Sequence, residues 1–242
     1  MDRLIKGLKT LGIQLTAQQR ADFERYAQEL IEWNQKFNLT AITDYEQVQI
    51  RHFLDSLSCL AAEEARTALK RPTPCVIDVG SGAGFPGIPL KIVCPNMHLT
   101  LLEATGKKVT FLEHIIDQLH LRNVVAIKSR AEELAHDPAH RQRYDLVLAR
   151  AVADLPVLME YTLPFCAIGG WVVAQKGESG AAEAWSADRA ISILGGELRR
   201  VMPVTLTGLP EDRSLVIVQK VSSTPVDYPR RPGMPAKRPL LE

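Results

Sequence analysis

The chain has 242 residues, of which 46% are hydrophobic and 24% charged, and its formal net charge is +1. That length allows one sizeable core with an accessory element, and the near-neutral charge argues against a surface that is basic throughout. The four cysteines lie far apart without a C-x-x-C pair, which favours neither a disulfide framework nor a metal site. We therefore expect reduced thiols in a cytoplasmic protein that has no signal peptide and no membrane span.

Residues 1–70 are predicted to form helices only, as a helical cap over a sheet. Thr16-x-x-Gln19 is a capping box ahead of apolar residues spaced three and four apart. A second helix is expected to start near Asp44 and to run past residue 60. Arg51, His52 and Asp55 lie beside its apolar stripe. An arginine–aspartate pair at this spacing is most often a solvated ion pair, and the alternative is a functional site.

Residues 71–221 alternate between strand and helix after the linker Arg71-Pro-Thr-Pro74. The predicted strands are Cys75–Gly80, Leu99–Ala104, Asn123–Lys128, Tyr144–Ala149 and Gly170–Gln175. Five such units predict a parallel, doubly wound sheet. Two further strands, Leu198–Leu206 and Ser214–Val221, are joined by a short loop, so the last strand must run antiparallel.

The stretch VIDVGSGAGFPGIPL joins the first strand to its helix and is typical of a nucleotide-binding loop. Read from Gly82, it fits the dinucleotide pattern G-x-G-x-x-G, with Glu103 placed to bind a ribose. Read from Asp78, it is an acid followed by alternating glycines, as in class I methyltransferases that bind S-adenosylmethionine (SAM). The terminal antiparallel hairpin favours the methyltransferase. The alternatives are an NAD(P)-dependent oxidoreductase and a SAM-binding module without activity.

Residues 222–242 form a proline-rich tail with a positive bias. Its five prolines are expected to exclude regular helix or strand and to favour extended backbone. The tail is then either disordered or an arm that lies on phosphates.

Several motifs together resemble one family. They are RHFLDS at 51–56, DVGSGAGFPGIPL at 78–90, LLEATGKKVTFL at 101–112, ARA at 149–151, QKG at 175–177 and YPRRPGMPAKRPL at 228–240. In this order they resemble the bacterial small-subunit (16S) ribosomal RNA N7-guanine methyltransferases, also called glucose-inhibited division protein B. The resemblance runs from Trp33 to Pro239. It implies an α/β class I SAM-dependent methyltransferase fold, with a seven-stranded sheet that ends in an antiparallel hairpin.

The resemblance and the glycine loop together imply a set of SAM-binding residues at the carboxyl ends of the strands, where open α/β sheets bind ligands. This set is Gly80, Gly82, Phe85, Glu103, Ala104, Thr105, Ala131, Glu132 and Arg150. Glu103 is expected to accept hydrogen bonds from the two ribose hydroxyls. Ala131 and Glu132 are expected to border the adenine.

The expected partner is 16S ribosomal RNA or an assembling small ribosomal subunit, bound by a monomer. Guanine N7 carries a lone pair and no proton at neutral pH, so no general base is needed and none is named. Residues expected to position the substrate are Arg51, His52, Asp55 and Lys176. Residues expected to bind RNA are Arg51, His52, Lys176, Arg230, Arg231, Lys237 and Arg238.

Overall fold

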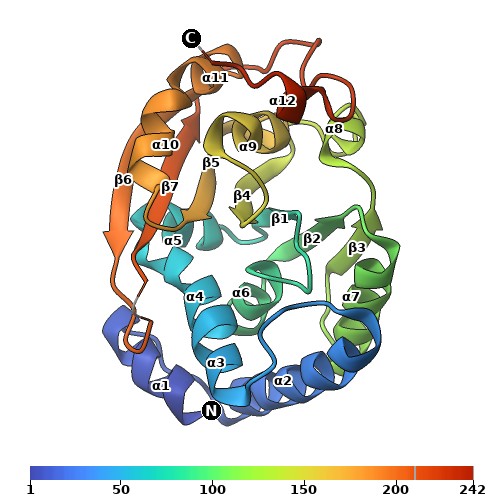
Figure 1. Ribbon diagram of the computed structural model, residues 1–242, viewed down its shortest axis with the longest axis vertical. Coiled ribbons are helices and arrows are strands. Elements are labelled where there is room, and N and C mark those ends of the chain that lie inside the picture. Colours follow the sequence, from blue (N-terminus) through green and yellow to red (C-terminus); the bar gives the residue numbers. More distant parts are fainter. Residues whose placement is uncertain (210, 242) are drawn as a thin grey trace.

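The computed structural model describes residues 1–209 and 211–241, and in this part of the chain seven strands form one sheet (Figure 1). The strands are β1 (Cys75–Val79), β2 (His98–Glu103), β3 (Val124–Lys128), β4 (Tyr144–Arg150), β5 (Cys166–Lys176), β6 (Gly196–Val204) and β7 (Arg213–Lys220). Their order is β3-β2-β1-β4-β5-β7-β6. β1 to β5 are parallel, and β7 runs antiparallel to both of its neighbours. The predicted methyltransferase topology is therefore confirmed.

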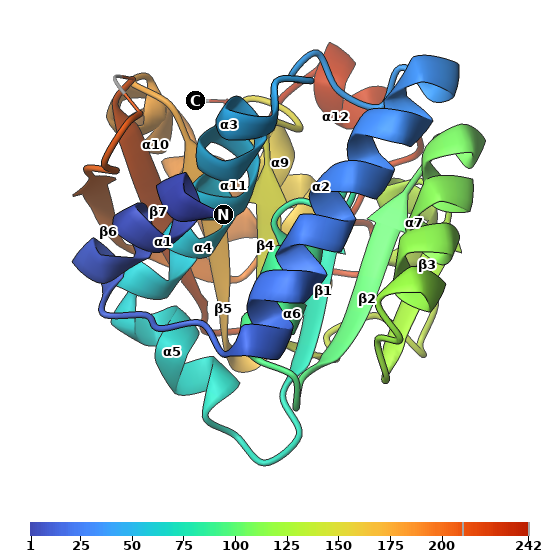
Figure 2. The same ribbon diagram turned by 90° about the horizontal axis from the view of Figure 1, so that it is seen from below.

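The sheet is covered by helices on both faces, which explains why its strands are apolar on both sides. One face carries α1 (Asp2–Leu8), α2 (Ala17–Phe37), α3 (Tyr45–Gln47), α4 (Asp55–Leu57), α5 (Glu63–Leu69), α6 (Gly87–Val93) and α7 (Gly106–Gln118), as Figure 2 shows. The other carries α8 (Ala131–Leu134), α9 (Leu155–Thr162), α10 (Gly180–Ser186), α11 (Asp188–Ile193) and α12 (Met234–Lys237). In β4, Leu146 and Leu148 pack on the first face, whereas Val147 and Ala149 pack on the second.

The first 70 residues contain helices as predicted, but the second helix is not a continuous α-helix. The Thr16 capping box is present, and the Asp44 side chain caps α3. After α3 the backbone becomes a π-helix (η2, Val48–Leu54), and a 3₁₀-helix follows α4 (η3, Ser58–Ala61). The hydroxyls of Ser56 and Ser58 donate to backbone carbonyls of this segment, and such side-chain bonds compete with regular helix geometry.

The C-terminal tail is more regular than its prolines predict. It includes one helical turn, α12, which was expected to be excluded. That expectation was wrong because Pro235 lies in the first turn, where its missing N–H would have had no partner. Tyr228 and Leu240 of the tail are partly buried against the hydrophobic core on the second face of the sheet.

The cysteines are all free, and Cys59 and Cys166 are buried in the core. Burial raises the pKa of the Cys166 thiol to about 12, and it raises the pKa of Cys59 further. Thiols held so firmly in the protonated form are poor nucleophiles. None of the helices in the described part of the chain is both long enough and apolar enough to cross a membrane.

Candidate active site

The glycine loop between β1 and α6 is shaped by its backbone. Gly80 has a φ of +72°, and a Cβ added there would lie 2.7 Å from a methyl carbon of Val152. Gly82 has a φ of +60°, and its N–H donates to Glu103. Glycine is therefore required at Gly80 both by conformation and by space.

The loop rests on the buried carboxyl of Asp78. One oxygen of this carboxyl accepts the N–H of Gly87 at 2.8 Å, at the start of α6. The other oxygen has no hydrogen-bond partner among the described residues. Burial raises the pKa of Asp78 to about 7, and the Gly87 N–H and the charge of Arg150 oppose that rise only in part. Asp78, the first residue of the motif, therefore holds the C-terminal end of the glycine loop through its bond to Gly87.

The helical cap also holds this loop. The hydroxyl of Tyr26 in α2 donates to the carbonyl of Ala83 at 2.6 Å, and its ring stacks on Phe85. Phe53 from η2 packs against the same two rings. The cap and the glycine loop therefore share one aromatic cluster.

Glu103 stands at the carboxyl end of β2 and is only 7% exposed. One of its oxygens accepts the N–H of Gly82 at 3.0 Å, and the other accepts the N–H of Thr105 at 2.8 Å. A carboxylate oxygen can accept two hydrogen bonds, so each still has one lone pair free of these contacts. The side chain both shapes the loop and has capacity to bind a diol.

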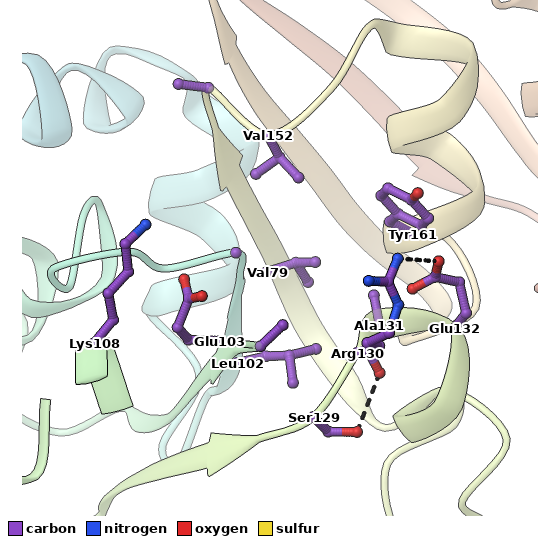
Figure 3. Close-up of a pocket in the computed structure, with 13 residues that line it drawn as sticks. Val79, Leu102, Glu103, Lys108, Ser129, Arg130, Ala131, Glu132, Val152 and Tyr161 are labelled. Carbon is purple, nitrogen blue, oxygen red and sulfur yellow. Dashed lines mark hydrogen bonds and ion pairs between the residues drawn. The ribbon is translucent and has the colours of Figure 1, made fainter. Parts of the chain in front are cut away.

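A first cavity of about 260 Å³ opens beside Glu103 (Figure 3). It is lined by Val79, Gly80, Leu102, Glu103, Ala104, Lys108, Ser129, Arg130, Ala131, Glu132, Ala151, Val152 and Tyr161. Figure 3 shows Glu103 and Lys108 on one side, and Arg130, Glu132 and Tyr161 across from them. Five residues of the predicted cofactor set line this cavity: Gly80, Glu103, Ala104, Ala131 and Glu132. Gly82, Phe85, Thr105 and Arg150 lie outside its lining.

Glu132 is a buried acid in the far wall of the first cavity, at 3% exposure. Burial alone would raise the pKa of its carboxyl. The hydrogen bonds from Arg130 at 2.9 Å and from the N–H of Gly233 outweigh burial, and the pKa is lowered. Glu132 is therefore a fixed negative charge at this wall.

A second cavity of about 390 Å³ adjoins the first at Ala151. It is lined by Ile42, Arg51, His52, Asp55, Arg150, Ala151, Gln175, Lys176, Gly177, Ser179 and Arg213. All four residues predicted to position the substrate are among them. The cap, β4, β5 and β7 each contribute to the wall, so this cavity exists only in the folded chain.

Asp55 is the centre of the ion pairs in the second cavity. It is 4% exposed and accepts from Arg150 of β4 at 2.8 Å and from Arg213 of β7 at 3.2 Å. Arg51 instead pairs with Glu211 at the rim, so the solvated Arg51–Asp55 pair suggested by their spacing does not form. That interpretation was wrong because Asp55 is turned toward the sheet, where two arginines distant in sequence reach it.

His52 is uncharged at neutral pH and does not act as a basic group. Burial, and then the charge of Arg150, lower the pKa of His52 from 6.5 to about 3. Its ring stacks on Phe85 with centroids 4.4 Å apart, and its Nε2 lies 2.8 Å from the hydroxyl of Thr40. His52 thereby links the cap to the glycine loop from the wall of the second cavity.

The remaining basic residues fall into separate places. Lys176 forms an ion pair with Glu183 at 2.6 Å and donates to the carbonyl of Ala153. Arg230 in the tail is bound to the buried Glu160. The exposed basic residues of the tail are Arg231, Lys237 and Arg238. The tail lies on the sheet face opposite the cap, so the predicted RNA-binding residues do not form one patch.

Sequence reasoning missed Arg213, Tyr161, Lys108 and Val152. Arg213 had one signal, since it is a charge at the start of an apolar strand next to the hairpin turn. Tyr161 lies within an apolar helix, and no feature of the sequence indicated its role.

No group of three His, Cys, Asp or Glu side chains among residues 1–209 and 211–241 is arranged to hold a metal ion.

Comparisons with known proteins identify the family of this chain. The model of the family described as GidB, rRNA small subunit methyltransferase G, matches residues 19–215. The ribosomal RNA small subunit methyltransferase G of Dehalococcoides mccartyi strain BAV1 is 50% identical over 241 residues, which covers 100% of both chains. The protein of the same name from Roseiflexus castenholzii is 48% identical, again with 100% coverage of both.

Solved structures show the same fold at low identity. A point mutant of MtNAS in complex with S-adenosylmethionine has a TM-score of 0.55 at 17% identity, over 84% of this chain and 73% of that one. TrmN from Thermus thermophilus has a TM-score of 0.51 at 19% identity, over 72% and 53%. Matched along its whole length by close relatives, the chain belongs to the rRNA small subunit methyltransferase G family.

Proposed function

We propose that this chain transfers the methyl group of SAM to N7 of a guanine in 16S ribosomal RNA. One observation carries the proposal: two cavities of different chemistry meet at Ala151. The first offers the carboxylate of Glu103 and backbone groups, and the second offers a cationic wall. A methyl donor in the first and a base in the second would have their reacting atoms at this shared boundary, and such placement is the main contribution to transfer.

The first cavity is the proposed SAM site, and SAM supplies there an electrophilic methyl group on a positively charged sulfur. Glu103, which already accepts two backbone N–H groups, would accept the ribose hydroxyls with its remaining lone pairs. Ala131 and Glu132, which line the cavity, would border the adenine. Gly80 and Ala104 have small side chains, so the cofactor could approach the backbone closely there. Gly82, Phe85 and Thr105 act by shaping the wall, because they lie beside the cavity.

The second cavity is the proposed guanine site. Its lining includes four cationic side chains, those of Arg51, Arg150, Lys176 and Arg213. Their carboxylate partners are Glu211 for Arg51, Glu183 for Lys176 and the shared Asp55 for the other two, so the cations outnumber the carboxylates by one. Such an excess of positive charge favours a phosphate-rich partner. Arg150, which was expected to touch SAM, is held by Asp55 and by the carbonyl of Arg51 on the substrate side.

No residue of the second cavity needs to act as a base. N7 would receive the methyl group through its own lone pair, and positive charge would pass from the bound donor to the purine ring. Asp55 pairs with Arg150 and Arg213, so its negative charge reduces the repulsion between these arginines and a positively charged purine ring. His52 remains neutral at physiological pH and adds no positive charge.

Both proposed sites are built from one chain, so we infer that the protein acts as a monomer. We also propose that it acts in the cytoplasm, on 16S ribosomal RNA or on an assembling small subunit. Arg51 and Lys176 would contact the RNA near the target base, and Arg231, Lys237 and Arg238 would contact it at a distance.

The test uses two RNA substrates and a labelled methyl donor. The chain is incubated with methyl-tritiated SAM and 16S RNA transcribed either with guanosine or with 7-deazaguanosine, which has carbon in place of N7. We expect label in the first RNA and none in the second. Label in both would contradict transfer to N7. SAM binding without label in either RNA, and without label in assembling small subunits offered in the same assay, would indicate a non-catalytic module. A parallel absorbance assay with NAD(P)H tests the oxidoreductase alternative.

A further inference from the structure

The C-terminal segment (residues 222–241) contacts the two helices that form the far wall of the first cavity. α8 contributes Ala131 and Glu132 to that wall, and α9 contributes Tyr161. Figure 1 shows α12 lying beside α8 and α9, and the helical cap lies on the opposite face of the sheet. We propose that the C-terminal segment positions the adenosine side of the cofactor pocket, with Arg230 as its anchoring residue.

Arg230 joins the segment to α9 through a buried carboxylate. Glu160 is fully buried, and it accepts from the Arg230 backbone N–H at 2.7 Å, from Nε at 2.9 Å and from a terminal guanidinium nitrogen at 2.6 Å. Among the described residues, every hydrogen bond that this carboxylate accepts comes from Arg230. A buried charge without partners is strongly unfavourable, so the pair fixes residue 230 against α9. Glu160 immediately precedes Tyr161 in that helix.

Gly233 joins the segment to α8 at the cavity itself. Its N–H donates to Glu132 at 2.9 Å, on the same oxygen that accepts from Arg130. Gly233 follows Arg230 by three residues, so the anchor on α9 limits how far this N–H can lie from Glu160. The C-terminal segment thereby supplies one of the donors that keep Glu132 charged and in place.

Two more contacts tie α8 to the same segment. His136, just after α8, lies with its Nε2 2.8 Å from the carbonyl of Pro229. The Arg141 guanidinium donates to the carbonyl of Ala135 and to that of Tyr228. A helix of one turn is not stable by itself, so the position of α8 depends on such tertiary contacts.

The basic residues of the tail therefore differ in role. Arg230 is an anchor within the protein, whereas Arg238 is exposed and forms no side-chain hydrogen bond or ion pair within residues 1–209 and 211–241. This difference provides a matched pair of substitutions in the same segment, Arg230→Met and Arg238→Met.

The experiment measures binding of SAM and of methylthioadenosine by calorimetry, without RNA, at a temperature where each variant is folded. For Arg230→Met we expect the Kd of both ligands to rise about tenfold, because both share the adenosine. Arg238→Met should leave both Kd values within about twofold of the wild type. Arg230→Lys keeps the charge but not the planar guanidinium, and it should raise Kd about threefold.

A lower melting temperature of Arg230→Met with wild-type Kd values would overturn the inference, because it would show a role in stability alone. If Arg230→Met fails to fold, Arg230→Lys decides in the same way, and an unchanged Kd then contradicts the proposal. The inference rests on the proposed placement of adenosine beside Ala131 and Glu132. Failure of the wild-type chain to bind SAM would refute that placement, which is a result distinct from any difference between variants.

Discussion

The two cavities are built by different means, although they meet at one residue. The first is made of the glycine loop, strand ends and the helices α8 and α9, and Glu103 accepts two backbone N–H groups in it. The second is made of charged side chains from the cap and three strands, and it is organised by the ion pairs of Asp55. A backbone change in the glycine loop should therefore affect the first cavity alone, and loss of the Asp55 charge should affect the second.

The largest effect is expected from removal of the central charge of the second cavity. Asp55→Ala leaves Arg150 and Arg213 without their shared carboxylate. Breaking a buried ion pair typically costs about 3–5 kcal/mol. Urea unfolding should show a loss of this size in the free energy of unfolding. Methyl transfer to RNA should fall more than about a hundredfold, with the Kd of SAM within about threefold.

The control for this variant is Asp212→Ala, which removes an exposed acid next to Arg213. It should change stability and transfer little. Equal losses of SAM binding and of RNA methylation in Asp55→Ala would show that the two cavities are not separable.

A backbone change should have the next largest effect, and only on the first cavity. Gly80→Ala places a Cβ against Val152 at a φ of +72°, so the loop must move. We expect the Kd of SAM to rise at least about tenfold. Gly12→Ala is the control, because its φ is +67° and nothing lies within 4 Å of an added Cβ. Both variants should lose about 1–2 kcal/mol of stability, and only Gly80→Ala should lose SAM affinity.

Loss of the proposed ribose acceptor should have a smaller effect. Glu103→Ala removes the acceptor of two loop N–H groups and of the ribose hydroxyls. Calorimetry should show SAM binding weakened by about 1–3 kcal/mol. An unchanged Kd would mean that Glu103 only supports the loop.

The contact of the cap with the glycine loop can be examined through the titration of His52, which stacks on Phe85. Its pKa is lowered in the folded chain to about 3, so the unfolded chain binds the extra proton as pH falls below 6.5. This group therefore contributes a loss of stability on acidification. Between pH 7 and pH 5 the wild type should lose about 2 kcal/mol more than His52→Asn, measured by urea unfolding at each pH.

Comparison with the variant is needed because the pKa of Asp78 is shifted upward, so its effect on stability has the opposite pH dependence to that of His52. The pKa of Asp78 is raised to about 7, so its contribution to stability is lost as pH rises from about 4 to 7. Both chains contain Asp78, and the difference between them removes its effect. Parallel stability curves for the two chains would contradict the neutral state of His52.

The smallest effect is expected far from both cavities. Replacing Lys237 and Arg238 by glutamine should leave SAM affinity unchanged. If these residues bind single-stranded RNA, the slope of log affinity against log salt should fall by about 0.7 for each phosphate that is no longer neutralised. The control removes Lys6 and Lys9 from the first helices in the same way. An equal change in slope for both pairs would indicate a general charge effect.

The sequence predicted the sheet well because its signals are local. Each strand is a short apolar run bounded by turn residues, and most observed ends differ from the predicted ones by one or two residues. β5 is the exception, since it begins at Cys166, where it pairs with Tyr144 across an irregularity in β4–β5 pairing. The antiparallel direction of β7 followed from the length of the loop before it.

The sequence by itself determined where the strands lie along the chain, the terminal antiparallel hairpin, the glycine loop and the acid at the end of β2. Each depends on residues close together in the chain, where periodicity and backbone conformation are readable. Only the tertiary structure decided that Asp55 pairs with Arg150 and Arg213, and that Arg230 is bound to Glu160. The partner of a charged side chain depends on which strands become neighbours and on how deeply it is buried, and neither property is local.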